Sequence, residues 1–223
     1  MSADPTEFIR SQLEAGPVPF VPEVSLYQAE EPIGLWELAE GEYHSDQPPP
    51  FWAFAWAGGQ GLARYVLDQP ALVARRAVLD LAAGTGLVGV AAALAGAASV
   101  RAVEIDPLAD AAIRLNAGLN GVAVVTALAD ILDGDAGGAD VVLAGDVFYS
   151  QAMSARMLTF LRRAARDGAE VFVGDPGRAY FPGDYFTPVA AYDVPVRFEL
   201  ESATTKPTTV WRMNSRGSAL KSR

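Results

Sequence analysis

A glycine-rich turn follows an apolar stretch near the middle of the chain. Residues 78–89 read Val-Leu-Asp-Leu-Ala-Ala-Gly-Thr-Gly-Leu-Val-Gly, a predicted strand that runs through the turn into a helix. Glycines let the backbone approach a ligand closely, and the first turn of the helix offers unpaired N–H groups. Glu104 stands twenty residues after Gly84, at the end of the next predicted strand, where a carboxylate can accept hydrogen bonds from ribose hydroxyls. The pattern predicts a nucleoside site at the carboxyl ends of two parallel strands.

Two classes of nucleoside cofactor, NAD and S-adenosylmethionine, bind in such a layout, and Asp80 separates them. Asp80 lies four residues before Gly84, where a dinucleotide-binding turn has small or apolar residues and receives a pyrophosphate. A carboxylate there would repel a pyrophosphate and attract the sulfonium and ammonium groups of S-adenosylmethionine. Asp80 therefore favours the methyl donor. The alternative is that Asp80 is only a solvated or capping residue of an ordinary α/β turn.

Acidic residues also follow the later predicted strands. Asp130 comes after the third strand, where its carboxylate would accept a hydrogen bond from an adenine amino group or would simply belong to a loop. Asp146 and Tyr149 follow the fourth strand and place an acid and a phenol at the same edge of the sheet, which predicts an active site. Asp175 and Arg178 follow the fifth strand. They either act at this edge or form a salt bridge that ties their own loop.

These residues depend on strands that alternate with helices. Alternation requires crossover connections and gives a mostly parallel sheet with helices on both faces. Two alternating runs near the C-terminus, 195–201 and 207–213, predict an antiparallel hairpin that completes the sheet. The expected fold class is therefore α/β, a Rossmann-like seven-stranded, mostly parallel sheet. The other predicted strands are 77–81, 99–104, 122–126, 140–145 and 169–174, and the predicted helices are near 60–67, 86–95, 107–118 and 151–166.

The N-terminal part of the chain differs in composition and is expected to form a short helical extension or lid. An N-cap before Pro5 predicts a short helix, and the prolines after it keep the chain extended. Phe51, Trp52 and Phe54 either belong to the site or only fill the core between lid and sheet. The chain is expected to divide into an extension or lid at 1–50, one domain at 51–213 and a flexible tail at 214–223. Within the extension we expect a helix at 4–15, helical turns at 33–40 and a loop at 41–50.

Charge and composition exclude several classes of protein. The chain has 17 Lys and Arg against 27 Asp and Glu, a net charge of −10, whereas a nucleic-acid-binding surface is basic. An acidic surface suits a basic protein or a cationic small molecule instead. Without cysteine there is no disulfide or thiolate metal site, the single histidine, His44, is expected at the surface, and Asp133 and Asp135 lack the spacing of a calcium loop. With no secretory signal and no membrane span, we expect a cytoplasmic protein without a metal.

The residue patterns resemble a known family. Residues 80–86 (Asp-Leu-Ala-Ala-Gly-Thr-Gly), 103–107 (Val-Glu-Ile-Asp-Pro) and 146–149 (Asp-Val-Phe-Tyr) are similar to motifs of the class I, seven-β-strand methyltransferases. Residues 51–60 (Phe-Trp-Ala-Phe-Ala-Trp-Ala-Gly-Gly-Gln) and 174–178 (Gly-Asp-Pro-Gly-Arg) resemble one branch of that class. This branch is the lysine methyltransferases of the electron transfer flavoprotein β subunit.

The resemblance implies roles for individual residues. A segment before the first strand of the sheet would close over the donor, and the acid and the phenol after the fourth strand would hold the target lysine. The implied cofactor-binding residues are Trp56, Gly58 and Gly59 in the closing segment, Asp80, Gly84 and Gly86 at the methionine end, Glu104 at the ribose, and Asp130 and Ile131 at the adenine. The implied catalytic residues are Asp146 and Tyr149, and the substrate-positioning residues are Phe148, Asp175 and Arg178.

The resemblance implies an S-adenosylmethionine-dependent protein-lysine N-methyltransferase that releases S-adenosylhomocysteine. Separately, we expect the protein to be a monomer. Its first expected substrate is the electron transfer flavoprotein β subunit, and a ribosomal protein is a second. Three alternatives stay open: a small-molecule (nicotinamide-like) N-methyltransferase, a NAD-dependent oxidoreductase and a non-catalytic donor-binding module. Asp80 and the lack of an evident acid–base pair for hydride transfer disfavour the oxidoreductase.

Overall fold

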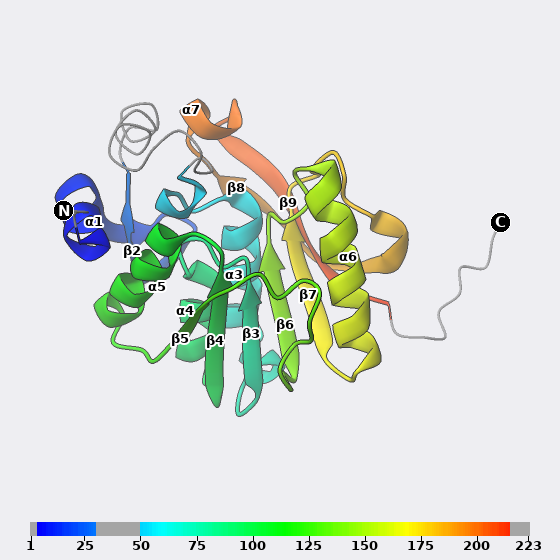
Figure 1. Cartoon of the computed structure of the whole chain (residues 1–223). Coiled ribbons are helices and arrows are strands. Elements are labelled where there is room, and N and C mark those ends of the chain that lie inside the picture. Colours follow the sequence, from blue (N-terminus) through cyan, green and yellow to red (C-terminus); the bar gives the residue numbers. More distant parts are fainter. Residues whose placement is uncertain (1–3, 30–49, 215–223) are drawn as a thin grey trace.

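A seven-stranded sheet forms the centre of the molecule (Figure 1). The computed structural model describes residues 4–29 and 50–214. The strand order is β5-β4-β3-β6-β7-β9-β8. Neighbouring strands from β5 to β7 are parallel, and β9 is antiparallel to both of its neighbours. The strands are β3 (Ala77–Leu81), β4 (Ser99–Glu104), β5 (Val125–Leu128), β6 (Val141–Gly145), β7 (Glu170–Asp175), β8 (Phe186–Pro195) and β9 (Thr205–Met213).

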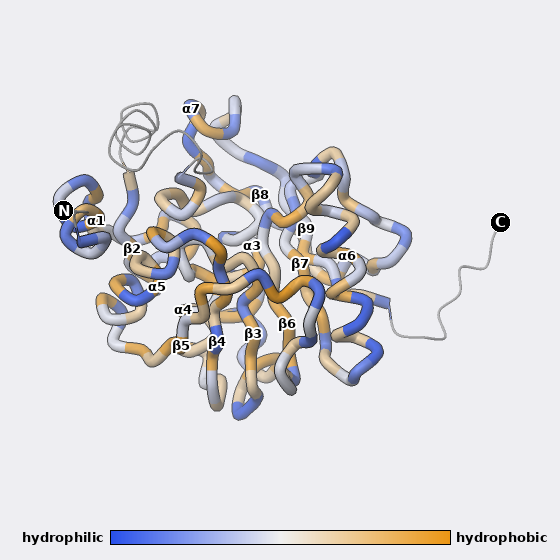
Figure 2. The backbone as a smooth tube through the Cα atoms, in the orientation of Figure 1, coloured by the Kyte–Doolittle hydropathy of each residue, from blue (hydrophilic) through white to orange (hydrophobic). Residues whose placement is uncertain are grey.

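Helices cover both faces of this sheet. α3 (Ala57–Asp68), α4 (Leu87–Leu94) and α5 (Pro107–Leu119) lie on one face, and α6 (Gln151–Arg166) lies on the other (Figure 1). Successive side chains of a strand point to opposite faces, so Val78 packs with α3 and α4 whereas Leu79 packs with α6. Figure 2 shows the hydrophobic residues along these central strands. This architecture confirms the predicted fold class. The prediction succeeded because strands that are buried on both faces carry nearly continuous apolar runs.

The C-terminal hairpin differs from the prediction. Most predicted elements lie close to their predicted bounds, and β5 is shifted from 122–126 to Val125–Leu128. The predicted strand at 195–201 is wrong, because β8 ends at Pro195 and Phe198–Glu201 forms the short helix α7. β8 is an edge strand with mostly exposed side chains and contains Pro188. Edge strands tolerate proline. Pro188 and the register irregularity between Pro188 and Ala190 interrupt the pattern of β8, whose buried residues, Phe186 and Val194, lie near its two ends.

The described part of the N-terminal extension is a helix followed by a hairpin. α1 (Pro5–Gln12) starts at Asp4, whose side chain accepts a hydrogen bond from the backbone N–H of Thr6. The chain then forms the antiparallel strands β1 (Glu14–Val18) and β2 (Val21–Gln28). The sequence predicted the start of this helix correctly but missed the hairpin, because prolines hide its alternating pattern.

Two asparagines of α5 hold this hairpin. The side-chain oxygens of Asn116 and Asn120 accept hydrogen bonds from the backbone N–H groups of Tyr27 and Ser25, at 2.8 and 2.9 Å. Residues 4–29 therefore lie beside α5 and line neither of the pockets described below. The predicted helical turns at 33–40 and most of the predicted loop, including His44, lie outside the described residues.

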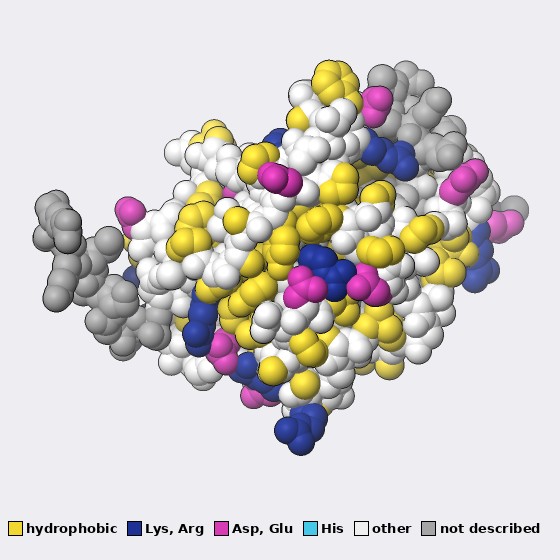
Figure 3. Space-filling view, turned by 180° about the vertical axis from the view of Figure 1, so that it is seen from behind, with side chains coloured by type: hydrophobic (Ala, Val, Ile, Leu, Met, Phe, Trp, Pro, Cys, Tyr) yellow, Lys and Arg dark blue, Asp and Glu magenta, His cyan; other side chains and the backbone are white. Residues whose placement is uncertain are grey.

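The face that Figure 1 turns away carries charges of both signs among hydrophobic side chains (Figure 3). Opposite charges also pair on α3, where the Arg64 guanidinium forms ion pairs at 2.8 Å with Glu23 and at 2.9 Å with Asp68. The charge on this face is therefore not gathered into one acidic field. Within residues 4–29 and 50–214, no helix is long and apolar enough to cross a membrane.

Glycines bring the start of α3 against the ends of β6 and β7. A Cβ atom added at Gly58 would overlap the carbonyl oxygen of Gly174 and lie 2.6 Å from Oδ2 of Asp146. A Cβ atom at Gly145 would lie 2.8 Å from the Cα of Gly59. Only glycine fits at these contacts, so the helix can reach the strand ends that carry the acidic residues.

This packing predicts the effect of alanine at two adjacent positions. Gly58→Ala is expected to destabilise the protein by at least about 2 kcal/mol, because its methyl group must displace the backbone of β7. Gly59→Ala is the matched control: an added Cβ meets nothing within 4 Å, and φ is not in the left-handed region. It is expected to change the free energy of unfolding by less than about 1 kcal/mol. Urea unfolding of both variants is the measurement, and equal midpoints would contradict the packing argument.

Candidate active site

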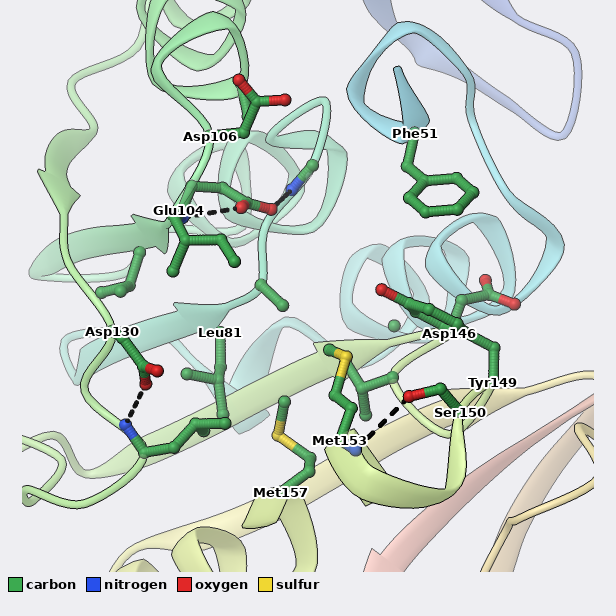
Figure 4. Close-up of a pocket in the computed structure, with 18 of the residues that line it drawn as sticks. Phe51, Leu81, Glu104, Asp106, Asp130, Asp146, Tyr149, Ser150, Met153 and Met157 are labelled. Carbon is green, nitrogen blue, oxygen red and sulfur yellow. Dashed lines mark hydrogen bonds between the residues drawn. The ribbon is translucent and has the colours of Figure 1, made fainter. Parts of the chain in front are cut away.

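The carboxyl ends of the parallel strands surround a cavity of about 560 Å³ (Figure 4). Open α/β sheets bind their ligands in the crevice outside the carboxyl ends of the strands. A smaller pocket of about 50 Å³ adjoins this cavity and shares Trp56, Gly84 and Asp146 with it. The residues lining the larger cavity include Leu81 of β3, Glu104 of β4, Asp130 and Ile131 after β5, Asp146 and Tyr149 after β6, and Met153 and Met157 of α6.

The glycine-rich turn and Glu104 form one side of the cavity. Ala82, Gly84 and Gly86 have positive φ angles of 53°, 54° and 78°, so the turn winds tightly before α4. Glu104 accepts a 2.7 Å hydrogen bond from the backbone N–H of Gly84 through Oε1 and a 2.9 Å bond from Ile105 N–H through Oε2. Burial raises the pKa of Glu104. A carboxylate has about four acceptor positions, so Glu104 keeps positions for hydroxyl donors.

Asp80 lies behind the turn, at the smaller pocket. It is 1% exposed, and its Oδ2 accepts a 2.7 Å hydrogen bond from the backbone N–H of Gly89. Burial raises the pKa of Asp80 to about 8. Because burial penalises the charged form, a cation beside Asp80 would favour its ionised state.

The loop after β5, the strand next to β4, also lines the cavity. Oδ1 of Asp130 accepts a 3.0 Å hydrogen bond from the backbone N–H of Leu132, and its carboxylate forms a 2.9 Å ion pair with Arg156 of α6. The hydrogen bond from Arg156 holds the pKa of Asp130 below its ordinary value. Arg156 thus orients an acid that the sequence placed at the adenine, and Ile131 lines the cavity beside it.

Three hydrogen bonds hold the Asp146 side chain in the cavity. Its φ is +56°, a left-handed conformation that aspartate tolerates better than most residues. Oδ1 accepts from Nε and Nη2 of Arg178 at 3.0 and 2.6 Å, and Oδ2 accepts from the backbone N–H of Gly59 at 3.0 Å. Burial raises the pKa of Asp146 to about 6 against the opposing effect of Arg178. With three acceptor positions used, about one remains on Oδ2.

Aromatic rings stand beside this carboxylate. Tyr149 is 45% exposed, and its ring centre lies 5.5 Å from that of Phe51. Phe51 also contacts Trp56, with ring centres 5.8 Å apart, and its carbonyl accepts a 2.8 Å hydrogen bond from the Trp56 indole. Phe51 and Trp52 line the cavity, and Phe54 lines the smaller pocket. Trp52 and Phe54 are also buried in the core cluster that contains residues of α1 and α5. Both interpretations of the aromatic run therefore apply, because these two rings border the site and fill the core.

Four predicted site residues line neither pocket: Gly58, Gly86, Phe148 and Asp175. Gly86 lies against Ile113 of α5. Phe148 is fully buried and packs edge-on against Phe181 and Phe186, at 5.5 and 6.2 Å between ring centres, so it belongs to the core. Gly58 faces β7 and lines neither pocket. Asp175 does not pair with the Arg178 guanidinium. Its Oδ1 accepts from the backbone N–H groups of Gly177 and Arg178, at 2.7 and 2.8 Å, and shapes their loop.

Sequence reasoning missed several residues of the cavity. Met153, Arg156 and Met157 lie on one side of α6, and their spacing of three and four residues was the available signal. Glu201, which contacts Arg178 at 2.8 Å, was hidden in the segment wrongly predicted as a strand. Among the described residues, no three or more His, Asp or Glu side chains form a group that could hold a metal ion.

Comparisons with known proteins indicate a methyltransferase. The family model of the ribosomal protein L11 methyltransferase (PrmA) matches residues 63–147. Electron transfer flavoprotein β subunit lysine methyltransferase from Danio rerio is 35% identical over 217 residues, 95% of this chain and 81% of the relative. The enzyme of the same name from Homo sapiens is 36% identical over 182 residues, 79% of this chain and 68% of the relative.

Solved structures agree on the fold. A putative RNA methyltransferase from Pyrococcus horikoshii has a TM-score of 0.56 at 17% identity and covers 77% of this chain and 90% of its own. An RNA methyltransferase from Salinibacter ruber, solved with S-adenosyl-L-homocysteine, has a TM-score of 0.51 at 22% identity and covers 73% of this chain and 95% of its own. Identities this low show the fold alone. The identity to the Danio rerio enzyme along most of both chains shows the family: this chain belongs to the electron transfer flavoprotein β subunit lysine methyltransferases.

Proposed function

We propose that the protein transfers a methyl group from S-adenosylmethionine to the Nζ of a lysine in the electron transfer flavoprotein β subunit. The observation that carries this proposal is that Asp146 and Tyr149 line the same cavity as Glu104 and the glycine-rich turn. Groups suited to a nucleoside and groups suited to an amine therefore share one cavity. Membership in the family supports a protein as the methyl acceptor.

The residues at one end of the cavity fit the donor. Glu104 has acceptor positions for ribose hydroxyls, Ile131 and Met157 offer apolar contacts for adenine, and Gly84 allows close backbone approach. The cavity of about 560 Å³ lies within the range of roughly 300–1,000 Å³ that small-molecule sites occupy. Asp80, when ionised, favours positive charge at the adjoining pocket. The bound donor supplies an electrophilic methyl group on a positively charged sulfur.

The residues at the other end fit a lysine side chain. An unperturbed lysine has a pKa of about 10.4, so reaching the neutral amine near pH 7.4 costs about 4 kcal/mol. Asp146 attracts the ammonium form, and the remaining acceptor position on Oδ2 orients the nitrogen. The contacting rings of Tyr149 and Phe51 form one aromatic wall for the alkyl chain. Methyl transfer needs the nitrogen lone pair aligned with the reacting carbon, and these three side chains restrict how the amine enters.

Asp146→Asn is expected to lower kcat by at least about a hundredfold, because a neutral amide neither attracts the ammonium group nor orients the nitrogen through a charged acceptor. Binding of S-adenosylhomocysteine is expected to stay within about threefold of the wild-type affinity. Turnover is measured as the transfer of radiolabelled methyl to purified electron transfer flavoprotein β subunit. The affinity for S-adenosylhomocysteine is measured by titration calorimetry.

Asp167→Asn, an exposed aspartate at the end of α6, is the control and should methylate normally. Normal turnover by Asp146→Asn would remove Asp146 from the mechanism. Labelling of small amines but not of intact protein would favour a small-molecule N-methyltransferase and contradict the proposal.

The raised pKa of Asp146 predicts a change of slope in the pH profile. Ionised Asp146 predominates above its pKa of about 6 and is lost as the pH falls through that value. Because the lysine must also lose a proton, log kcat/KM should rise with a slope of about two below pH 6 and about one above it. In Asp146→Asn the slope should be about one throughout. Rates between pH 5 and 8 test this, and a wild-type slope of about one below pH 6 would argue against a role for ionised Asp146.

Glu104→Gln is expected to weaken S-adenosylhomocysteine binding by about tenfold or more, because hydrogen bonds to a charged acceptor are worth roughly 1.5–3 kcal/mol. Glu170→Gln at the opposite end of the sheet, where Glu170 pairs with Arg76, is the control and should bind normally. Titration calorimetry is the measurement. Tight binding of NADH in place of S-adenosylhomocysteine would support the oxidoreductase instead.

A further inference from the structure

The Arg178 guanidinium lies between two carboxylates. On one side it donates to Oδ1 of Asp146 through Nε and Nη2, at 3.0 and 2.6 Å. On the other side it donates to Glu201, from Nη1 to Oε2 at 3.1 Å and from Nη2 to Oε1 at 2.8 Å. The planar fork of arginine suits such paired contacts. Arg178 therefore links Glu201 to the carboxylate of the active site.

Glu201 has a second cationic partner. Lys206 Nζ donates to its Oε2 at 2.5 Å. The Glu201 side chain is only 3% exposed, less than those of Asp146 at 11% and Arg178 at 20%. Burial would raise the pKa of Glu201, but Arg178 and Lys206 together hold it below its ordinary value. Glu201 thus stays ionised in a buried position because two cations compensate it.

The C-terminal hairpin supplies both of these outer groups. Glu201 is the last residue of α7, and Lys206 lies at the start of β9, which pairs with β7. Asp146 and Arg178 come from the loops after β6 and β7. The four side chains carry two negative and two positive charges, so the network is formally neutral.

We propose that Glu201 is a positioning residue for methyl transfer: it holds the Arg178 guanidinium, which in turn fixes the Asp146 carboxylate with one acceptor position free for the lysine amine. This inference rests on the proposed function. Without Glu201, the long Arg178 side chain is free to move toward solvent or to cover the remaining acceptor position of Asp146. Both movements misplace the amine without altering the residues that fit the donor.

The kinetic test compares two glutamates of the same helix. Glu201→Gln is expected to lower kcat at least about tenfold when the rate is divided by the number of S-adenosylhomocysteine-binding sites. Its affinity for S-adenosylhomocysteine should stay within about twofold of the wild-type value. Glu199→Gln, an exposed residue of α7, should match the wild type. Loss of a buried ion-pair partner also destabilises proteins, so rates are normalised to the number of binding sites. Fewer sites with an unchanged rate per site would mean a structural role only and would overturn the proposal.

A shorter acid guards against failure of the glutamine variant to fold. Glu201→Asp keeps the charge but loses one methylene of reach, so its kcat per site should fall between those of the wild type and Glu201→Gln. A wild-type kcat for Glu201→Asp would contradict the need for a correctly placed carboxylate.

A crystal structure of Glu201→Gln with S-adenosylhomocysteine separates this proposal from the proposed function. The expected result is loss of the two Arg178 contacts to Asp146. If the wild-type protein methylates no lysine, the proposed function fails, and this structure still reports whether Glu201 positions Asp146. Unchanged contacts between Arg178 and Asp146 would overturn the positioning role.

Discussion

The burial of the Asp146 carboxylate is the constraint on which the rest of this site depends. An unpaired charge in that position would be costly, so donors must reach it from several directions. The backbone N–H of Gly59 arrives from the start of α3, and the guanidinium of Arg178 arrives from the loop after β7. The glycines at the start of α3 and at the ends of β6 and β7 follow from this requirement, because bulkier residues would hold the helix away.

The parallel sheet brings the other half of the site to the same place. Carboxyl ends of parallel strands meet at one edge, so Glu104 of β4 and Asp146 after β6 face one cavity although they belong to different crossover units. The two acids have different surroundings. Glu104 is held only by backbone N–H groups, which leaves acceptor positions for hydroxyls. Asp146 is held mainly by a cation, which leaves about one position and compensates its charge.

The peripheral elements are tied to residues of the site from both ends of the chain. Asn116 joins the N-terminal hairpin to the site, because its side chain accepts from Tyr27 N–H and donates to the carbonyl of Thr85 in the glycine-rich turn. At the other end, α7 and β9 bring Glu201 and Lys206 to Arg178. A shared core fold with such additions can keep one donor site while its substrate end changes.

The sequence by itself determined the central strands, the helices between them and the positions of Glu104 and Asp146 at strand ends. Buried parallel strands carry apolar runs, and helix starts carry capping residues such as Asp106 before Pro107, so both are local signals. The edge strand β8 lacks such a continuous signal, because it pairs with one strand, β9, and its buried side chains, Phe186 and Val194, lie near its two ends. Only the tertiary structure decided that Phe148 faces the core and that Glu201 reaches Arg178. The first depends on the left-handed turn at Asp146 and the second on a contact between distant segments, and neither leaves a periodic pattern in the chain.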